Sequence, residues 1–264
     1  MSKGKEDKAP RDDKGIRLNK FISHNTKYSR READKLIENE KVKIKGVVVT
    51  NLSTRLKKGD KVYVNGRFVH TKNEFTVLVY NKQKGELVTK KDDRGRKTIY
   101  DNLSKRYGHY LSVGRLDFAS EGLLLLTDSP KIANILANSN LERVYYLKIK
   151  GAVTADMIDG MKNGLIAHNA KAGAHQMSKI VSMEFAPFNW FKIQKNDPMY
   201  SKIKVSISEG QNRELRRFFA YYGSEVMDLK RVEFGGVSLD IPLGKQRFLT
   251  KTEYHSLHTF LQGI

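Results

Sequence analysis

The sequence predicts an α+β protein of two domains. A small module of two helices and short strands precedes a larger domain, built on a mixed, mostly antiparallel sheet with flanking helices. The 264 residues exceed the usual length of one domain, and 39% of them are hydrophobic, enough for a packed core. The apolar pattern changes from helical spacing near the N-terminus to strand-like alternation further on. Charge is also uneven, because +10 of the net +20 lies in residues 1–70.

The net charge indicates a polyanionic partner. The chain has 49 Lys and Arg against 29 Asp and Glu, and residues 1–70 alone have 19 against 9. This surplus favours nucleic acid, although the lysines could form an ordinary solvated surface. An anionic membrane surface is another alternative. However, no long basic amphipathic helix is evident, and the longest leucine run, Leu123 to Leu126, is too short to span a bilayer.

Composition also limits the compartment and the chemistry. The N-terminal residues Met-Ser-Lys-Gly-Lys-Glu-Asp-Lys lack the apolar stretch of a secretory signal, so we expect a cytoplasmic protein. The absence of cysteine excludes disulfides, zinc fingers and thiol nucleophiles, and the seven histidines lack ligand spacing. We therefore expect no metal, no cofactor, no membrane association and, by default, a monomer.

Residues 1–15 are expected to form a flexible basic tail, and residues 16–67 a compact module. Its first helix is indicated by Leu18, Phe21 and Ile22 at helical spacing. The string Ser29-Arg-Arg-Glu32 is a capping box that opens a second helix, with Ala33, Leu36 and Ile37 as the buried stripe. Arg31 and Lys35 are four residues apart on the opposite face, where RNA phosphate could dock. The strands follow at 42–44, 47–49 and 61–64.

Residues 68–74 are interpreted as a linker and residues 75–264 as the larger domain. Its expected elements are a strand at 75–80, a charged loop from Asp92, a short helix at 99–103, a helix at 132–136 and a strand at 144–150. Strand alternation places Tyr145 and Tyr146 on opposite faces of the last of these.

Residues 113–127 place one carboxylate, Asp117, on a tight connection between two apolar segments. Arg115 lies two positions before it and Gly122 five after, so that a cation, a carboxylate and a sharp turn come together. Such an aspartate could act as a nucleophile. The alternative is a turn-capping aspartate, the usual role of an isolated aspartate near glycine.

A third motif joins a strand at 202–207 to a helix that begins after Asn212. Leu215, Phe218, Phe219 and Tyr222 form the buried stripe of this helix, and Gly223 ends it. Arg213, Arg216 and Arg217 cluster in its first turns, beside the positive end of the helix dipole. Because cations are disfavoured there, we expect a carboxylate or phosphate nearby.

These motifs resemble those of the pseudouridine synthases, in the branch that modifies single ribosomal RNA uridines and carries an S4 RNA-binding domain in front. Gly114, Arg115, Leu116, Asp117, Ser120 and Gly122 match the catalytic motif, and residues 16–67 resemble the S4 domain. Three positions depart from the pattern: Ala119 replaces an acidic or amide residue, Gln83 a turn proline, and Glu40 the glycine after the second helix. We expect Asn39 to take the left-handed position instead of Glu40.

The resemblance implies conversion of uridine to pseudouridine in ribosomal RNA, with large-subunit RNA favoured by overall similarity. Asp117 would act at the ribose, either by attacking C1′ or by taking the C2′ proton, and the residues leave both routes open. Arg216 would pair with Asp117, Tyr145 would stack on the uracil, and Leu215 would pack against it. Arg115 would fill the space left by the extruded base. The other expected substrate-binding residues are Arg213, Arg217, Arg31 and Lys35.

Two other functions remain open at this point. The chain could be a catalytically silent factor that binds ribosomal RNA or pre-ribosomal particles and helps in assembly. It could also be another S4-bearing RNA protein, which would leave the three spaced motifs unexplained. The combination of Asp117, Tyr145 and Arg216 favours the enzyme, because a binding protein does not need a carboxylate held beside an arginine.

Overall fold

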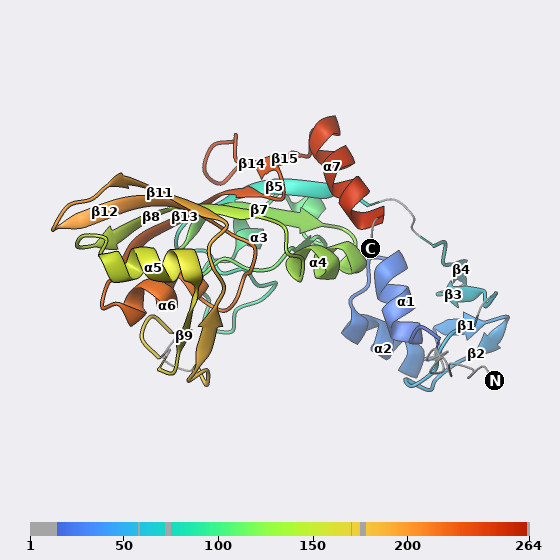
Figure 1. Cartoon of the computed structure of the whole chain (residues 1–264). Helices are drawn as coiled ribbons and strands as arrows, with labels where there is room; N and C mark the ends of the chain where they lie inside the picture. Colours follow the sequence, from blue (N-terminus) through green and yellow to red (C-terminus); the bar gives the residue numbers. More distant parts are fainter. Residues whose placement is uncertain (1–14, 58, 72–74, 170, 175–177, 263–264) are drawn as a thin grey trace, which may run out of the picture. The chain divides into compact units, whose positions relative to one another are not determined.

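The structure of the chain is a computed structural model that describes residues 15–57, 59–71, 75–169, 171–174 and 178–262. These residues form two compact units that divide at residue 75 (Figure 1). Most of the predicted tail, residues 1–14, and part of the predicted linker, residues 72–74, lie outside the described residues. The predicted domain limits remain predictions.

The front unit contains two helices and a four-stranded antiparallel sheet in the order β2-β1-β3-β4. Its elements are α1 (Leu18–Asn25), α2 (Arg30–Glu38), β1 (Val42–Ile44), β2 (Val47–Val48), β3 (Val62–Val64) and β4 (Arg67–Phe68). Leu18 and Ile22 of α1 pack with Ala33 and Ile37 of α2 in its core, as the helical spacing predicts. The predicted capping box is present, because Ser29 accepts from the Glu32 N–H and Glu32 accepts from the Ser29 N–H.

The end of α2 differs from the expectation. Asn39 has φ −85°, whereas Glu40 has φ +59° and occupies the left-handed region. The expectation that Asn39 takes this position is wrong. Asn39 donates its N–H to carbonyls of the last helical turn, so the reversal of the chain falls one residue later. Glu40 therefore adopts a conformation that costs a residue with a side chain about 1 kcal/mol more than glycine.

The larger unit is a sheet with the main strand order β11-β12-β8-β13-β7-β5-β15; β14 also pairs with β13, and β6 with β7. Neighbouring strands are antiparallel except for β13 and β7, which are parallel. Its strands are β5 (Val77–Lys82), β6 (Leu111–Ser112), β7 (Glu121–Thr127), β8 (Arg143–Lys150), β11 (Trp190–Lys195), β12 (Tyr200–Ile207), β13 (Val226–Phe234), β14 (Val237–Ser238) and β15 (Gln246–Phe248). A separate hairpin pairs β9 (Leu165–Ala167) with β10 (Met183–Phe185). The mixed, mostly antiparallel sheet predicted from the sequence is confirmed.

The helices of this unit are α3 (Ile99–Asn102), the 3₁₀ turn η1 (Lys105–Tyr107), α4 (Pro130–Ala137), α5 (Ala155–Asn163), α6 (Glu214–Tyr221) and α7 (Lys251–Gln262). Figure 1 shows α5 and α6 on the same face of the strands β11, β12, β8 and β13. None of the described helices combines the length and the apolar character needed to cross a membrane.

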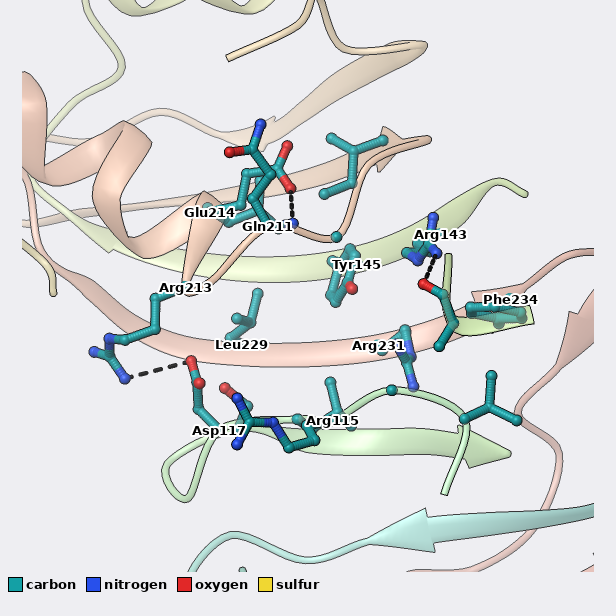
Figure 2. Close-up of a pocket in the computed structure, with 18 residues that line it drawn as sticks. Arg115, Asp117, Arg143, Tyr145, Gln211, Arg213, Glu214, Leu229, Arg231 and Phe234 are labelled. Atoms are coloured by element: carbon teal, nitrogen blue, oxygen red, sulfur yellow. Dashed lines mark hydrogen bonds and ion pairs between the residues drawn. The ribbon is translucent and has the colours of Figure 1, made fainter. Parts of the chain in front are cut away.

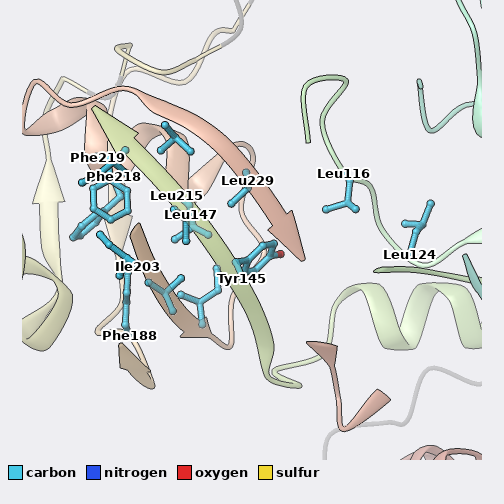
Figure 3. Packing of buried hydrophobic residues seen from close by; sticks show 14 of the residues in the cluster. Leu116, Leu124, Tyr145, Leu147, Phe188, Ile203, Leu215, Phe218, Phe219 and Leu229 are labelled. Atoms are coloured by element: carbon cyan, nitrogen blue, oxygen red, sulfur yellow. The ribbon is translucent and has the colours of Figure 1, made fainter. Parts of the chain in front are cut away.

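Two hydrophobic cores lie on opposite faces of the strands β5 and β7. Leu124 and Leu126 of β7 belong to the core under α5 and α6, part of which is drawn in Figure 3, whereas Leu123 and Leu125 belong to the core formed with α4 and α7. Burial on both faces explains why β7 is a continuous apolar run, without alternation. At the β11-β12-β8 end, side chains on the other face alternate with buried ones and are half-buried or exposed.

Candidate active site

Asp117 lies on the loop between β6 and β7, and a buried lysine holds this loop. Lys82, at the end of β5, donates from Nζ to the main-chain carbonyls of Gln83, Asp117 and Ser120, at 2.9, 3.1 and 2.8 Å. Its side chain is inaccessible to solvent. Burial lowers the pKa of Lys82 to about 8, although the nearby acids Glu86, Asp117 and Glu121 oppose this change. These hydrogen bonds to main-chain carbonyls fix the backbone of the loop that carries Asp117.

The Asp117 carboxylate faces two arginines of the third motif. Its Oδ2 lies 3.3 Å from Nη1 of Arg213 and 3.5 Å from Nε of Arg216. The carboxylate is 28% exposed, so it is reachable from outside while it remains beside the two cations. Opposite charges at this distance attract each other, so the two cations orient the carboxylate. The anion expected beside the first turns of α6 is therefore a carboxylate from a loop almost 100 residues earlier in the chain.

Arg216 is the more deeply placed of these two arginines. It donates from Nη1 to the Val226 carbonyl at 2.8 Å, and from Nη2 to the Ala119 carbonyl and the Ser120 hydroxyl, each at 3.2 Å. Burial lowers the pKa of Arg216, Arg213 lowers it further, and Asp117 raises it. An arginine stays charged under these conditions. Arg216 thus ties α6, β13 and the Asp117 loop together and presents one edge to the carboxylate.

Arg213 takes its position from an unusual backbone conformation. It precedes α6 with φ +53°, in the left-handed region, and its Nε donates to the Gly173 carbonyl at 2.7 Å. Gly173 in turn lies so close to α6 that a Cβ there would be 2.4 Å from the Arg216 carbonyl oxygen. This close approach lets a loop residue fix Arg213, and Arg213 extends toward Asp117 (Figure 2).

The carboxylate borders a pocket with a cavity volume of about 100 Å³. Tyr145 of β8, Leu215 of α6 and Leu229 of β13 form an apolar wall, and Arg115 is an exposed residue at its edge. Tyr145 is 7% exposed and its neighbour Tyr146 is 38% exposed, as strand alternation predicts. The pocket therefore combines a carboxylate, a ring that could stack and an apolar wall, which suits a small planar group.

Comparisons with known proteins agree with this geometry. Residues 76–221 match the family described as RNA pseudouridylate synthase, and residues 16–62 match the S4 domain. The first match spans more than half of the chain. The chain belongs to the RNA pseudouridylate synthase family. An S4 domain thus precedes a pseudouridine synthase fold, and the fold class predicted from the sequence is confirmed.

Relatives extend over nearly the whole chain. An uncharacterized RNA pseudouridine synthase of Helicobacter pylori J99 is 50% identical over 249 residues, which are 93% of this chain and 95% of the relative. The ribosomal large subunit pseudouridine synthase B of Bacillus subtilis is 33% identical over 244 residues, 91% and 95% of the two chains. A crystal structure of a pseudouridylate synthase superposes with a TM-score of 0.59 at 26% identity, covering 92% of this chain and all of that one.

The structure brings most of the predicted site residues of this pseudouridine synthase together. Five line the pocket, namely Arg115, Asp117, Tyr145, Arg213 and Leu215, and Arg216 contacts it through Asp117. The structure does not support the expectation that Arg217 binds the substrate. This side chain is almost inaccessible to solvent and donates from Nη2 to the Ser178 hydroxyl, so it is not available to the substrate. The helical period explains this, because Arg216 and Arg217 point about 100° apart. Arg31 and Lys35 are exposed on α2 of the front unit.

Several pocket residues were not assigned from the sequence. Glu214 and Arg143 line the pocket. Burial raises the pKa of Glu214 to about 7, although its carboxylate accepts the Gln211 N–H at 2.8 Å, which lowers it. Arg143 donates to the carbonyls of Leu141, Ser208, Ala137 and Ser139, and so holds the loops at one end of the pocket. Among the described residues, no group of three or more His, Asp or Glu is placed to bind a metal.

Lys82 and Arg231 were also missed, and both were within reach of the sequence. Lys82 directly precedes Gln83, the position where the resemblance predicts a turn proline, and Arg231 lies shortly after the helix of the third motif. These positions could have suggested a role for each residue. The contacts that they make could not have been predicted, because partners such as Asp117 and Leu123 lie far away along the chain.

Proposed function

We propose that this pseudouridine synthase modifies one uridine of large-subunit ribosomal RNA, with Asp117 acting at the ribose. The observation that carries the proposal is the Asp117 carboxylate, partly accessible and placed beside Arg213 and Arg216 at the edge of the pocket. The printed name of the Bacillus subtilis relative, a ribosomal large subunit enzyme, supports the choice of RNA.

The reaction breaks the bond between C1′ and N1 of uridine, turns the uracil over and joins C5 to C1′. C5 loses its proton and N1 gains one, so no electrons or groups enter or leave overall. An ionised carboxylate beside the sugar suits this chemistry, either as a nucleophile at C1′ or as the base that removes the C2′ proton. Arg216 and Arg213 hold the carboxylate oriented through their charges.

The uridine must leave the RNA stack to reach Asp117, because stacking hides C1′ and C5. Arg115 is exposed next to Asp117 in sequence, which suits a side chain that fills the vacated space in the RNA. Inside the pocket, Tyr145 stacks on the uracil and assists removal of the C5 proton, while Leu215 packs against the ring. The apolar wall limits the access of water that would compete for the ribose.

The rest of the RNA would be held by positive charge. The S4 unit carries Arg31 and Lys35 on one exposed helix face, and we assign them to phosphate contacts. A ribosomal RNA target places the reaction in the cytoplasm, on free RNA or on pre-ribosomal particles, as one of the steps of ribosome biogenesis. The enzyme needs no metal or cofactor for the isomerisation in this proposal, and a monomer contains the whole site.

Replacement of Asp117 by asparagine tests the proposal. Asp117→Asn keeps the size of the side chain and removes its charge, so release of tritium from C5-labelled ribosomal RNA should fall by about three orders of magnitude or more. Affinity for the RNA should stay within about threefold, because the pocket keeps its shape. Asp240→Asn, which removes a carboxylate that pairs with Arg247 instead, is the matched control and should retain the wild-type rate.

Mapping of pseudouridine in the ribosomal RNA of cells with and without the gene identifies the target uridine. Tritium release by Asp117→Asn at the wild-type rate would show that Asp117 has no part in the chemistry. RNA binding by the wild-type chain without any pseudouridine formation would instead favour the silent assembly factor.

A further inference from the structure

Arg231 lies on β13, in the middle of the sheet, and lines the pocket. On β13 it lies directly opposite Tyr145 of β8, and Gly122 of β7 is its partner on the other side. Residues that are directly opposite in a sheet place their side chains on the same face. Arg231 therefore shares the pocket face with Tyr145, and both line the cavity together with Leu229. Only 3% of Arg231 is exposed.

The guanidinium of Arg231 has unused hydrogen-bonding capacity. Its Nε donates to the Leu123 carbonyl at 2.7 Å, whereas its Nη2 is buried without a hydrogen-bond partner among the described residues. No ion pair to Arg231 is formed within the described part of the chain. A buried donor left without a partner costs free energy, and a charged one costs more.

Arg143 provides a contrast within the same pocket. Both guanidinium groups lie near the Phe234 ring, with the Arg143 carbon at 5.0 Å and the Arg231 carbon at 5.3 Å from its centre. Arg143 satisfies its donors with four main-chain carbonyls and so has a structural role. Arg231 lines the same pocket but has a guanidinium nitrogen without a partner, which suits a residue that binds the substrate.

We infer that Arg231 donates a hydrogen bond from its guanidinium group to a carbonyl oxygen of the extruded uracil. This inference rests on the proposed function. In Figure 2, Asp117 and Arg213 lie toward one end of the pocket, and Tyr145 and Arg231 toward the other. With the ribose at Asp117, the atom of uridine that reaches furthest from the sugar is O4, because C4 is opposite N1 in the ring. Arg231 is therefore assigned to O4 of the substrate.

The same contact survives the reaction. Turning uracil about the axis through N3 and C6 exchanges N1 with C5 and O4 with O2. In the product, C2 is opposite the atom bonded to C1′, so O2 occupies the place that O4 held. The same donor can therefore form a hydrogen bond with O4 of the substrate and with O2 of the product. Cytosine would present an amino group there instead, and two donors would face each other, so Arg231 selects uracil over cytosine.

The test uses short RNAs that contain the mapped target position as uridine, 4-thiouridine or 2-thiouridine. Sulfur is a weaker acceptor than oxygen, so the wild-type enzyme should have a lower kcat/KM for 4-thiouridine than for uridine, by about tenfold. 2-Thiouridine is the comparison, because O2 does not face Arg231 in the substrate orientation. Arg231→Lys should lower kcat/KM for uridine by about ten- to hundredfold and reduce the difference between uridine and 4-thiouridine to nearly none.

Controls separate this inference from the proposed function. Glu233→Gln, on the same strand, should keep the wild-type preference, and melting temperatures identify a variant that fails to fold. A wild-type enzyme that converts 4-thiouridine as fast as uridine overturns the inference without any variant. An Arg231→Lys enzyme that keeps the wild-type ratio of kcat/KM for uridine to kcat/KM for 4-thiouridine also overturns the inference. If the wild-type enzyme makes no pseudouridine at all, the proposed function fails instead.

A second inference concerns the outer lysine face, which we define as Tyr146, Lys148, Lys192, Lys202, Lys204 and Lys230. These residues alternate with buried ones on β8, β12 and β13 and with half-buried ones on β11, on the side of the sheet away from the pocket. The register places lysines directly opposite each other, Lys192 with Lys204 and Lys202 with Lys148. Like charges directly opposite are destabilising, so this arrangement needs a compensating anion.

Acids on this side of the sheet offset the lysines only in part. Glu121 is the register partner of Lys230, whereas no ion pair to Lys192, Lys202 or Lys204 is formed among the described residues. Lys204 lies 5.3 Å from the Tyr146 ring and 5.5 Å from the Trp190 ring, and Lys148 lies 4.3 Å from the Tyr200 ring. Asp228, the partner of Lys148 in the register, forms its ion pair with Lys84. The face therefore presents several cations among accessible aromatic rings.

We propose that a second segment of the substrate RNA lies on the outer lysine face. Phosphates are the anions that a row of lysines about 5 Å apart would compensate, and rings such as Tyr146 and Trp190 allow unpaired bases to stack. Because this face is opposite the pocket, the segment is different from the one that supplies the target uridine. The enzyme thus holds its RNA on both sides of the sheet.

Two triple variants with the same change in charge test this surface. Lys192→Gln/Lys202→Gln/Lys204→Gln removes cations from the face, and Lys131→Gln/Lys162→Gln/Lys251→Gln removes exposed cations from α4, α5 and α7. Each is combined with Asp117→Asn, so that binding to a transcript of large-subunit RNA is measured without turnover. The face variant should lower the slope of log Kd against log salt by about two, and the control should leave it nearly unchanged.

Equal slopes for the two triple variants would overturn the surface proposal, and they would leave the proposed function untouched. Without the Asp117 change, the face variant should keep the wild-type kcat at saturating RNA, because none of its three lysines reaches the pocket. A drop in kcat would also speak against a role limited to binding. Melting temperature checks the fold, and the loss of like-charge pairs should not lower it.

Discussion

At the residue scale, Lys82 links the chemistry of the site to the stability of the fold. Its ammonium bonds three carbonyls, two of them in the Asp117 loop. Lys82→Met should leave the carbonyls of Asp117 and Ser120 without this donor and loosen the loop. We expect kcat to fall by about tenfold or more, while the Kd for RNA stays within about threefold. A loss of RNA affinity with an unchanged kcat would contradict this role.

Lys82 also predicts a dependence of stability on pH. At pH 7 the amine is protonated in the folded and unfolded states. Between about pH 8, its pKa in the folded state, and its ordinary value of 10.5, the unfolded state binds more protons. Stability from this group therefore rises with pH over that interval. From pH 7 to 9.5, the wild-type enzyme should gain about 2 kcal/mol relative to Lys82→Met. Urea titrations followed by Trp190, the one tryptophan of the chain, measure this difference.

The sequence predicted the position of single residues where a motif spans a short segment. Asp117 and Tyr145 occupy the pocket, and Arg216 reaches Asp117, in agreement with the motif spacing and strand alternation. Arg217 could not be separated from Arg216 by the motif, because the loop that buries it, near Ser178, has no signal in the sequence. The free Nη2 of Arg231 is a property of the packed sheet, and no local pattern contains it.

At the element scale, local signals predicted the ends of helices and the identity of strands. Ser29 and Glu32 form their capping box, and the apolar run 123–126 becomes a strand buried on both faces. Which strands pair was not contained in these signals. In particular, the parallel contact of β7 with β13 joins residues more than 100 positions apart, and it is this contact that puts the Asp117 loop beside α6.

Gly122 is the residue that permits this parallel contact. Its φ is +105°, and a Cβ would lie 2.1 Å from the Arg231 carbonyl oxygen. Gly122→Ala should therefore separate β7 from β13 and destabilise the catalytic unit by about 3 kcal/mol or more. Gly236→Ala is the matched control, because Gly236 has φ +80° with open space around it, so only the conformational cost of about 1 kcal/mol applies. Equal losses in urea titrations of the two variants would refute a steric role for Gly122.

At the scale of the whole molecule, each unit has its own hydrophobic core and its own surplus of cations. Residues 1–70 hold half of the net charge in about a quarter of the chain. Composition was sufficient to favour a nucleic-acid partner and to predict an uneven division of charge, whereas the choice of RNA came from the family resemblance. Composition did not predict where the cations of the larger unit gather, because the outer lysine face depends on the register of β11, β12 and β8.

The charge of the front unit leads to a prediction for binding and turnover together. Arg31→Gln/Lys35→Gln removes two exposed cations from α2, far in sequence from the pocket residues. KM for ribosomal RNA should rise, the slope of log KM against log salt should decrease by about one to two, and kcat should stay unchanged. Lys43→Gln/Lys61→Gln, with the same loss of charge on exposed residues of β1 and of the segment just before β3, is the matched control and should keep the wild-type slope.

Combining Arg31→Gln/Lys35→Gln with the triple variant of the outer lysine face tests whether the two units hold separate parts of the RNA. Contacts with different phosphates act independently, so the two decreases in log affinity should add. If both sets of cations served the same phosphates, the combined loss would be clearly smaller than the sum. Titration of all four proteins, in the Asp117→Asn background and at one salt concentration, distinguishes these outcomes because the electrostatic part of binding is then compared under equal screening.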